Sequence, residues 1–545
     1  MHRELFDCEG VARWYWYVNF SDCGVELGEL ERNAPIPYGI IMHLELVLKG
    51  RLCMRLLVAG LTLLVGLSSI STASIAASSA DLLHVQQCVQ GKTKVSAECG
   101  TLRVYENRST AMGRTILIHF IVLKAKHPNG HVIYVNLGGP GEELSEVPFL
   151  ANGGGLKELQ ALRDRYDILF VDERGFGLSH PITCQLTPPA HPELYFSALW
   201  PAKLLAACRG RSAKTSDLAQ YNTKNAIADL EDLRGALRYK KLIFDVGSYG
   251  TYTALQYMRR YPSSVGSSVF MGVDPPGLAN LTLAFAKGSQ MSFDQLSADC
   301  SRDTTCRTTF PDFRAHFYAI LHRLDSGPIP IKVKNAVTSK IQTVMLSREV
   351  FADAVRHLLY DPEGASYLPY IITHAYDGDT LPLGTLVDLL AQSFAQGIQQ
   401  GAFLSYTCSE DMPFGNSPAD LQHAKSISWF GDDRIAAQLN ACKIWNVPAL
   451  PAGFNNPVRT AAPILMFSGT VDPATPAYQG TDALKYLSNA RQMLIKNAPH
   501  DAESACTDRI AVQFIRSGGS WKGIALNACT GNFKRPPFAT TWPPH

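Results

Sequence analysis

The chain contains the stretch Phe244-Asp245-Val246-Gly247-Ser248-Tyr249-Gly250-Thr251, which lies between an apolar run and a helical pattern. The apolar run at 242–244 predicts a buried strand, and the residues after the stretch carry apolar side chains at the spacing of one helix face. Gly247 and Gly250 allow a sharp turn between the two elements. Such a turn holds the Ser248 hydroxyl above the sheet edge, where the N-terminal amides of the helix can stabilise an oxyanion. The stretch therefore predicts a strand-turn-helix unit with Ser248 as a candidate nucleophile.

Two later segments supply candidate partners for Ser248. The buried strand predicted at 462–468 is followed by Asp472, and the strand predicted at 492–495 is followed by His500. Each residue taken alone is an ordinary turn or surface residue. Serine, acid and histidine in this order, each in a loop after a strand, are however typical of a catalytic triad on a parallel sheet. The order predicts Ser248 as nucleophile, His500 as general base and Asp472 as the acid that orients the base.

The groups that bind the oxyanion are expected upstream of the nucleophile. A strand predicted at 131–137 leads into Gly138-Gly139-Pro140-Gly141, where backbone without side chains can approach a reacting carbonyl closely. A glycine run of this kind is by itself often an ordinary loop. Given the triad order, we assign the oxyanion hole to the backbone amides of Gly139 and Tyr249.

A series of motifs follows one order along the chain. The motifs are Gly138-Gly139-Pro140-Gly141, Asp172-Glu173-Arg174-Gly175-Phe176-Gly177-Leu178-Ser179, Asp229-Leu230-Glu231-Asp232-Leu233-Arg234, Gly247-Ser248-Tyr249-Gly250-Thr251, Asp472 and His500. In this order they resemble the secreted tripeptidyl aminopeptidase family, a branch of the proline-iminopeptidase-like α/β-hydrolases, over roughly residues 85–530. The resemblance implies a serine exopeptidase that removes short peptides or single residues from free N-termini, often with proline near the cut.

Two departures from the family pattern leave the substrate class open. Val246 stands where the G-x-S-x-G motif has its first glycine. Glu142-Glu143 follow the glycine run, where the family usually has small residues. In the second motif, Asp172 and Arg174 are expected to form a structural ion pair under the active site, because arginine cannot act as a base.

The positions of the predicted strands indicate an inserted helical segment. After the strand that ends before the Asp-Pro-Pro-Gly turn at 274–277, the pattern becomes mainly helical, and strand patterning resumes only near Pro463. We therefore expect an α/β-hydrolase fold, a mostly parallel sheet flanked by helices, built from residues 81–277 and 456–545 and interrupted by a helical cap at 278–455. A cap over the carboxyl edge of the sheet favours small or terminal substrates over folded proteins.

Two adjacent acids in the cap are candidates for binding a substrate amine. Glu410 and Asp411 lie beside a cysteine expected to form a disulfide, and buried carboxylates can pair with a protonated amine. Adjacent acids in a loop are as often simply solvated, and this alternative stays open. Glu142 and Glu143 are the second choice for the same role, although they also fit the first turn of a helix.

The first part of the chain is predicted to be an addressing segment. Residues 54–80 contain an uncharged apolar run and then a serine- and alanine-rich stretch with small-residue cleavage sites. This pattern is typical of a secretory signal, and the apolar run is short for a membrane span. We interpret residues 1–53 as an upstream mis-start, with initiation at Met54 or Met42, so that residues 1–80 are not part of the mature enzyme. A true N-terminal extension with an internal membrane anchor is the alternative.

Composition and cysteine content agree with an exported globular enzyme. The chain has 545 residues, of which 46% are hydrophobic and 18% charged, and its net charge of +2 gives no reason to expect nucleic acid binding. All but Cys8, Cys23 and Cys53 of its 13 cysteines follow the signal, and an even number in an exported chain favours disulfides. Proximity in sequence predicts the pairs Cys88–Cys99, Cys184–Cys208, Cys300–Cys306, Cys408–Cys442 and Cys506–Cys529.

These features together predict a secreted or periplasmic serine hydrolase that forms an acyl-enzyme with a small peptide or acyl substrate. We expect no cofactor and no metal, because the sequence has no zinc-type Cys-x-x-Cys, phosphate loop or dinucleotide fingerprint. An esterase or amidase with the same triad is the first alternative, and a non-catalytic binding protein on a decayed hydrolase fold is the second. No stable membrane span is expected in the mature chain, and the sequence leaves the oligomeric state open.

Overall fold

The computed structural model describes residues 82–90, 94–141, 157–278, 280–500, 502–531 and 533–542. The predicted signal at 54–80, the interpretation of residues 1–53 and the candidate acids Glu142-Glu143 lie outside these ranges. Within the described part of the chain, none of the helices combines the length and the apolar character that crossing a membrane requires.

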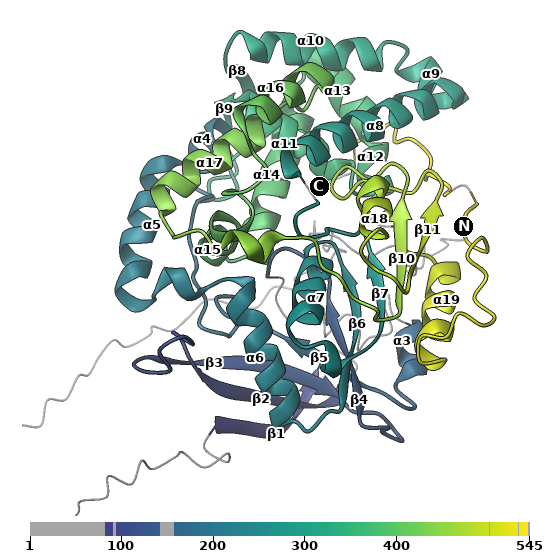
Figure 1. Ribbon diagram of the computed structural model, residues 1–545. Coiled ribbons are helices and arrows are strands. Elements are labelled where there is room, and N and C mark those ends of the chain that lie inside the picture. Colours follow the sequence, from purple (N-terminus) through teal and green to yellow (C-terminus); the bar gives the residue numbers. More distant parts are fainter. Residues whose placement is uncertain are drawn as a thin grey trace, which may run out of the picture. The chain divides into compact units, whose positions relative to one another are not determined.

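The described residues are built around a nine-stranded sheet (Figure 1). Its strands, in spatial order, are β1 (Leu83–Gln90), β2 (Val95–Tyr105), β3 (Thr115–Leu123), β5 (Asp167–Val171), β4 (His131–Asn136), β6 (Lys241–Gly247), β7 (Val265–Met271), β10 (Ile464–Gly469) and β11 (Ala490–Ile495). The pairs β1/β2, β2/β3 and β3/β5 are antiparallel, and every pair from β5/β4 to β10/β11 is parallel. The predicted mostly parallel sheet is therefore confirmed.

The central parallel strands are apolar over most of their length. The sequences HVIYVN in β4, KLIFDVG in β6 and ILMFSG in β10 are typical of strands buried on both faces. Helices cover both faces accordingly. One face packs against α6 (Thr223–Ala236), α7 (Tyr249–Arg260) and α18 (Ala477–Ala483), and the other against α3 (Lys157–Leu162) and α19 (Ala505–Arg516).

Between β7 and β10 the chain is mainly helical, as predicted (Figure 1). This inserted segment contains α8 (Leu281–Arg302), α9 (Thr304–Thr309), α10 (Phe313–Asp325), α11 (Arg348–Leu358), α12 (Pro362–Ser366), α13 (Leu368–Tyr376), α14 (Leu381–Gly397), α15 (Gln400–Glu410), α16 (Pro418–Ile427), α17 (Asp433–Trp445) and the short η4 (Ala452–Asn455). Its helices bury a hydrophobic core of their own, which includes Phe293, Phe317 and Val355.

The inserted segment also contains a two-stranded antiparallel sheet, β8 (Ile329–Lys334) with β9 (Ile341–Leu346). The expectation that strands resume only near Pro463 is therefore wrong. Strand β8 reads IPIKVK, and its alternation buries Ile331 and Val333 in the core of the inserted segment. The strand is short and contains Pro330, which argues against a strand in a sequence pattern.

Helices from the segment between β5 and β6 also pack against the insertion. Helix α4 (Pro192–Ser197) contributes Tyr195 and Phe196 to the core of the inserted helices, and α5 (Ala202–Thr215) contacts α17. Two further short helices among the described residues are η2 (Leu218–Gln220) and η3 (Pro262–Ser264). The cap boundaries at 278 and 455 stay a prediction.

The predicted disulfides are confirmed. The structure contains all five pairs: Cys88–Cys99, Cys184–Cys208, Cys300–Cys306, Cys408–Cys442 and Cys506–Cys529.

The predicted ion pair between Asp172 and Arg174 is wrong. The fully buried Arg174 guanidinium instead binds both carboxylate oxygens of Asp229 on α6, at 2.7 and 2.8 Å. Asp172 accepts from the backbone N–H of Leu178 at 2.9 Å and lies 3.1 Å from His119 Nδ1. The two side chains therefore have different partners. Arg174 connects the residues after β5 to α6, and Asp172 contacts β3 and its own loop.

Candidate active site

Ser248 lies at the sharp turn between β6 and α7. Its backbone has a φ of 49° and a ψ of −126°, a strained conformation for a residue with a side chain. Its N–H donates to the carbonyl of Met271 on β7 at 2.9 Å. Gly250 allows β4 to approach, because a Cβ there would lie 2.3 Å from the carbonyl oxygen of Asn136. Val246 is buried within β6, so the turn forms with valine where the motif usually has glycine.

His500 follows β11 and Asp472 follows β10, at the same carboxyl edge of the sheet as Ser248. His500 Nδ1 lies 3.0 and 2.9 Å from the two carboxylate oxygens of Asp472. Asp472 also accepts from the N–H groups of Ala474 and Thr475, at 2.7 and 2.9 Å, and from the Thr475 hydroxyl at 2.7 Å. Burial alone would raise the pKa of Asp472, but His500 and these hydrogen bonds outweigh it and hold the pKa below its ordinary value. A charged carboxylate therefore orients the His500 ring.

The glycine loop after β4 lies against the nucleophile. A Cβ on Gly138 would lie 3.0 Å from Ser248 Cβ, so the loop approaches this closely only because it lacks a side chain there. Tyr249 is the first residue of α7, so its N–H has no acceptor within the helix. Gly139 and Tyr249, the two predicted oxyanion-hole residues, line the same cavity as Ser248.

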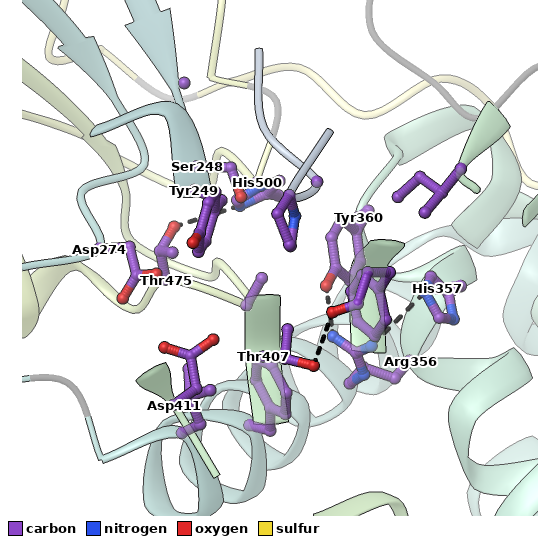
Figure 2. A pocket seen from close by; sticks show the side chains of 18 of the residues that line it. Ser248, Tyr249, Asp274, Arg356, His357, Tyr360, Thr407, Asp411, Thr475 and His500 are labelled. Carbon is purple, nitrogen blue, oxygen red and sulfur yellow. Dashed lines mark hydrogen bonds between the residues drawn. The ribbon is translucent and has the colours of Figure 1, made fainter. Parts of the chain in front are cut away.

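This cavity has a volume of about 180 Å³ and lies between the sheet edge and the inserted helices (Figure 2). Ser248 and His500 line it from the sheet and lie next to each other in the view of Figure 2. The inserted segment contributes polar side chains from α11, α15, α17 and the residues that follow them: Arg356, His357, Tyr360, Thr407, Asp411 and Arg434. Both the sheet edge and the inserted segment therefore limit access to Ser248.

The two acids predicted in the inserted segment have different surroundings. Asp411 follows α15 and lines the cavity, and its carboxyl group points into the cavity in Figure 2. Glu410 is fully buried and accepts from the Tyr249 hydroxyl at 2.7 Å and from the Thr223 hydroxyl and N–H at 3.0 and 3.2 Å. Among the described residues, those that line the cavity do not include Glu410. Glu410 therefore lies behind the cavity wall and contacts the cavity residue Tyr249.

Besides Asp411, the carboxyl group of Asp274 lines the cavity, and this residue is absent from the sequence-based prediction. It follows β7, so the strand-end criterion that found Asp472 applies to it as well. Burial raises the pKa of Asp274 to about 7, although the nearby His500 acts in the opposite direction. Burial, then Glu410 and Asp274, raise the pKa of Asp411, and burial raises that of Glu410. None of the ion pairs among the described residues includes these three acids, and burial is the largest influence on the pKa of each.

Two further cavity residues, Arg356 and Tyr360, were also missed. Their spacing places them on one face of α11 and its continuation, but the sequence marks this helix only as amphipathic. The Tyr360 ring packs edge-to-face on the His500 ring at 4.8 Å. The contact between the end of α11 and His500 forms only in the folded chain, so the sequence gives no indication of it.

The arrangement supports acyl transfer. A strained serine, a histidine oriented by a charged carboxylate and a free helix N-terminal amide border one cavity. In the ranges that the structure describes, no group of three or more His, Cys, Asp or Glu side chains could hold a metal ion. That catalysis needs neither metal nor cofactor stays a prediction.

Comparison with known proteins identifies the class. Residues 151–502 match the family of the alpha/beta hydrolase fold, and the chain belongs to this family. With this fold and its serine site, it is a serine hydrolase.

Individual relatives include both peptidases and esterases. The serine protease Hip1 of Mycobacterium tuberculosis is 25% identical over 427 residues, which cover 73% of this chain and 80% of the relative. Carboxylesterase B of the same organism is 24% identical over 457 residues, which cover 78% and 85%. Among solved structures, the proline iminopeptidase of Mycobacterium smegmatis matches 77% of this chain and 98% of its own, at 13% identity and a TM-score of 0.37. The expected resemblance to peptidases of this fold is thus matched by Hip1.

Proposed function

We propose that the chain is an exported serine aminopeptidase that releases short peptides or single residues from free N-termini. In the first step His500 Nε2 takes the proton of the Ser248 hydroxyl while Oγ forms a bond to the scissile carbonyl carbon. The backbone amides of Gly139 and Tyr249 hold the resulting oxyanion, and Asp472 stabilises the imidazolium.

The second half of the reaction returns the enzyme to its starting state. The scissile C–N bond breaks, and His500 gives its proton to the leaving amine. A water molecule, deprotonated by His500, then attacks the acyl-enzyme, and the proton passes back to Ser248 Oγ as the ester bond breaks. No other proton donor is needed.

The observation that carries the proposal is the carboxyl-lined wall of the cavity. Asp411 and Asp274 border the cavity that holds Ser248, with Glu410 behind them, and none of the ion pairs among the described residues includes these acids. A protonated N-terminus would pair with Asp411 as its direct partner, and Glu410 would fix the position of Tyr249. We propose Asp411 and Glu410, in these two roles, as the amine-binding acids.

An esterase is the second candidate, because carboxylesterase B matches the chain about as well as the serine protease does. The triad would hydrolyse an ester by the same steps. An esterase has no use for an acidic wall, and for this reason we place the aminopeptidase first.

Export rests on the cysteines. Five disulfides persist in oxidising compartments and are rare in the cytosol, which supports a secreted or periplasmic enzyme. We further propose that residues 278–455 act as a cap that admits chain ends to the cavity.

The test compares a short peptide with a free N-terminus and the same peptide acetylated. Acetylation removes the ammonium and leaves the acidic wall without a partner, so kcat/KM should fall roughly 30- to 1000-fold, about 2–4 kcal/mol. Asp411→Asn should lower kcat/KM for the free peptide and largely remove the difference. Asp377→Asn, at an exposed acid outside the cavity, is the matched control and should retain the difference in kcat/KM between the free and the acetylated peptide. Equal cleavage of both peptides by the wild-type enzyme would replace the aminopeptidase with the esterase.

A further inference from the structure

The cavity has a second charged wall, which the proposed amine site does not use. Arg356 on α11 and Arg434 on α17 both line the cavity and are 1% and 7% exposed. They share one carboxylate, since Arg356 Nη2 and Arg434 Nε each lie 3.2 Å from Asp353 Oδ1. The neighbouring His357 adds no further positive charge, because burial lowers its pKa to about 4. Two buried guanidinium groups therefore face the cavity with a single carboxylate between them.

Arg356 is held in a fixed orientation. Its guanidinium carbon lies 4.4 Å from the ring centre of Phe285, 5.1 Å from that of Tyr360 and 5.6 Å from that of Phe430, and Nη1 donates to the Tyr360 hydroxyl. Its Nε has no hydrogen-bond partner although it is buried. The rings occupy the space around the guanidinium group, so further partners must bind through its N–H groups. A buried arginine with an unused donor at a cavity is suited to a carboxylate.

The position of Arg356 connects it to one part of the substrate. Its partner Tyr360 packs on the His500 ring, so a single aromatic ring lies between Arg356 and the catalytic base. In the proposed reaction His500 gives its proton to the leaving amine, which must therefore lie on this side of the cavity. One or two residues in extended conformation are long enough to reach from the leaving amine beside His500 to the Arg356 guanidinium group.

We propose that Arg356, supported by Arg434, binds the C-terminal carboxylate of a short leaving group. The substrate class is then a short peptide with both ends free, cut one or two residues before its C-terminus. The acidic wall with Asp411 takes the ammonium and the arginine wall takes the carboxylate (Figure 2). This inference rests on the proposed aminopeptidase function and adds recognition of the second chain end.

The experiment uses four versions of one tripeptide, with the N-terminus free or acetylated and the C-terminus free or amidated. For the wild-type enzyme, amidation of the free-amine peptide should lower kcat/KM roughly 10- to 100-fold, the usual cost of one lost charged hydrogen-bond pair. In Arg356→Gln the ratio of the acid to the amide should fall close to one. Arg348→Gln is the matched control, because Arg348 lies on the same helix, pairs with Asp325 and Asp433 and does not line the cavity. It should keep the wild-type ratio.

The four peptides separate the two proposals. If acetylation matters and amidation does not, the carboxylate site is refuted and the aminopeptidase stands. If neither modification matters and simple esters are hydrolysed, the aminopeptidase itself is refuted. A wild-type preference that survives in a folded Arg356→Gln enzyme would overturn the assignment to Arg356. If this variant does not fold, the wild-type pair of acid and amide still decides whether the site exists.

Discussion

Replacing Asp472 by asparagine tests the proposed triad at its most constrained point. Oδ1 accepts from the N–H groups of Ala474 and Thr475, at 2.7 and 2.9 Å, and Oδ2 accepts from the Thr475 hydroxyl at 2.7 Å. An asparagine has one acceptor oxygen, and two backbone N–H groups fix it at the Oδ1 position. The NH₂ group then occupies the Oδ2 position, 2.9 Å from His500 Nδ1, while the oxygen at the Oδ1 position, 3.0 Å from Nδ1, already accepts from two backbone N–H groups.

The consequence is the wrong tautomer of the base. An NH₂ donor requires His500 Nδ1 to accept, so the ring proton moves to Nε2, and Nε2 can no longer take the proton of Ser248. A loss of this kind lowers kcat on the order of 10⁴-fold, which corresponds to about 5 kcal/mol of transition-state stabilisation. The fold should survive, because the backbone hydrogen bonds of the loop are kept.

The assay is kcat/KM of Asp472→Asn on both a free-amine peptide and a simple ester. Both rates should fall together, because the tautomer affects the base and not the substrate. Asp482→Asn, at a partly exposed acid of α18 that pairs with Lys485, is the control and should retain full activity. Residual activity above a tenth of the wild-type rate in Asp472→Asn would show that Asp472 does not orient the base.

Two further predictions concern stability. Gly250→Ala should lower the free energy of unfolding, measured with denaturant, by about 1–3 kcal/mol and should lower activity, because the new Cβ would lie 2.3 Å from the carbonyl oxygen of Asn136. Gly235→Ala on α6 is the control, because no atom lies within 4 Å of its Cβ, and it should leave the stability unchanged. Asp274 has a folded-state pKa of about 7 against an ordinary value of 3.8, so the unfolded chain loses this proton first and stability falls as the pH rises between these values. Asp274→Asn should therefore melt at a higher temperature than the wild type at pH 8, and the difference in melting temperature should vanish near pH 4. Equal melting temperatures of the wild type and the variant at pH 8 would contradict the raised pKa.

The positions of the candidate catalytic residues could be predicted because a parallel sheet brings its carboxyl ends to one edge. Ser248 and Asp472 follow the short apolar strands β6 and β10, and His500 follows β11, whose last three residues are Met, Leu and Ile. Apolar runs of this kind are readable from sequence. Strand order then determines that these loops are neighbours. The same rule applies to Asp274, which follows β7.

The residues proposed for specificity could be predicted only in part, because they lie on or next to helices that meet the sheet only in the folded chain. Glu410 and Asp411 are adjacent, and adjacent helical residues point about 100° apart, so only one of them can face the cavity. Sequence alone does not state which one. Arg356 lies in a helix that is buried almost all round, and its sequence pattern does not distinguish a packed residue from one that lines a cavity.

The division between the two parts of the fold suggests how the enzyme discriminates among acyl compounds. In the proposed mechanism the sheet edge supplies the same bond-breaking groups for esters and for amides, so selection between them would come from the walls of the cavity. The carboxyl groups near Asp411 and the guanidinium groups of Arg356 and Arg434 are buried and lack a full set of oppositely charged partners. Burial of such groups costs free energy in both walls. A neutral ester relieves neither cost. A short peptide with both ends charged relieves both at once, and only if its length places each end at the wall of opposite charge. Charge and length together would then define the substrate, and the triad would require no preference of its own.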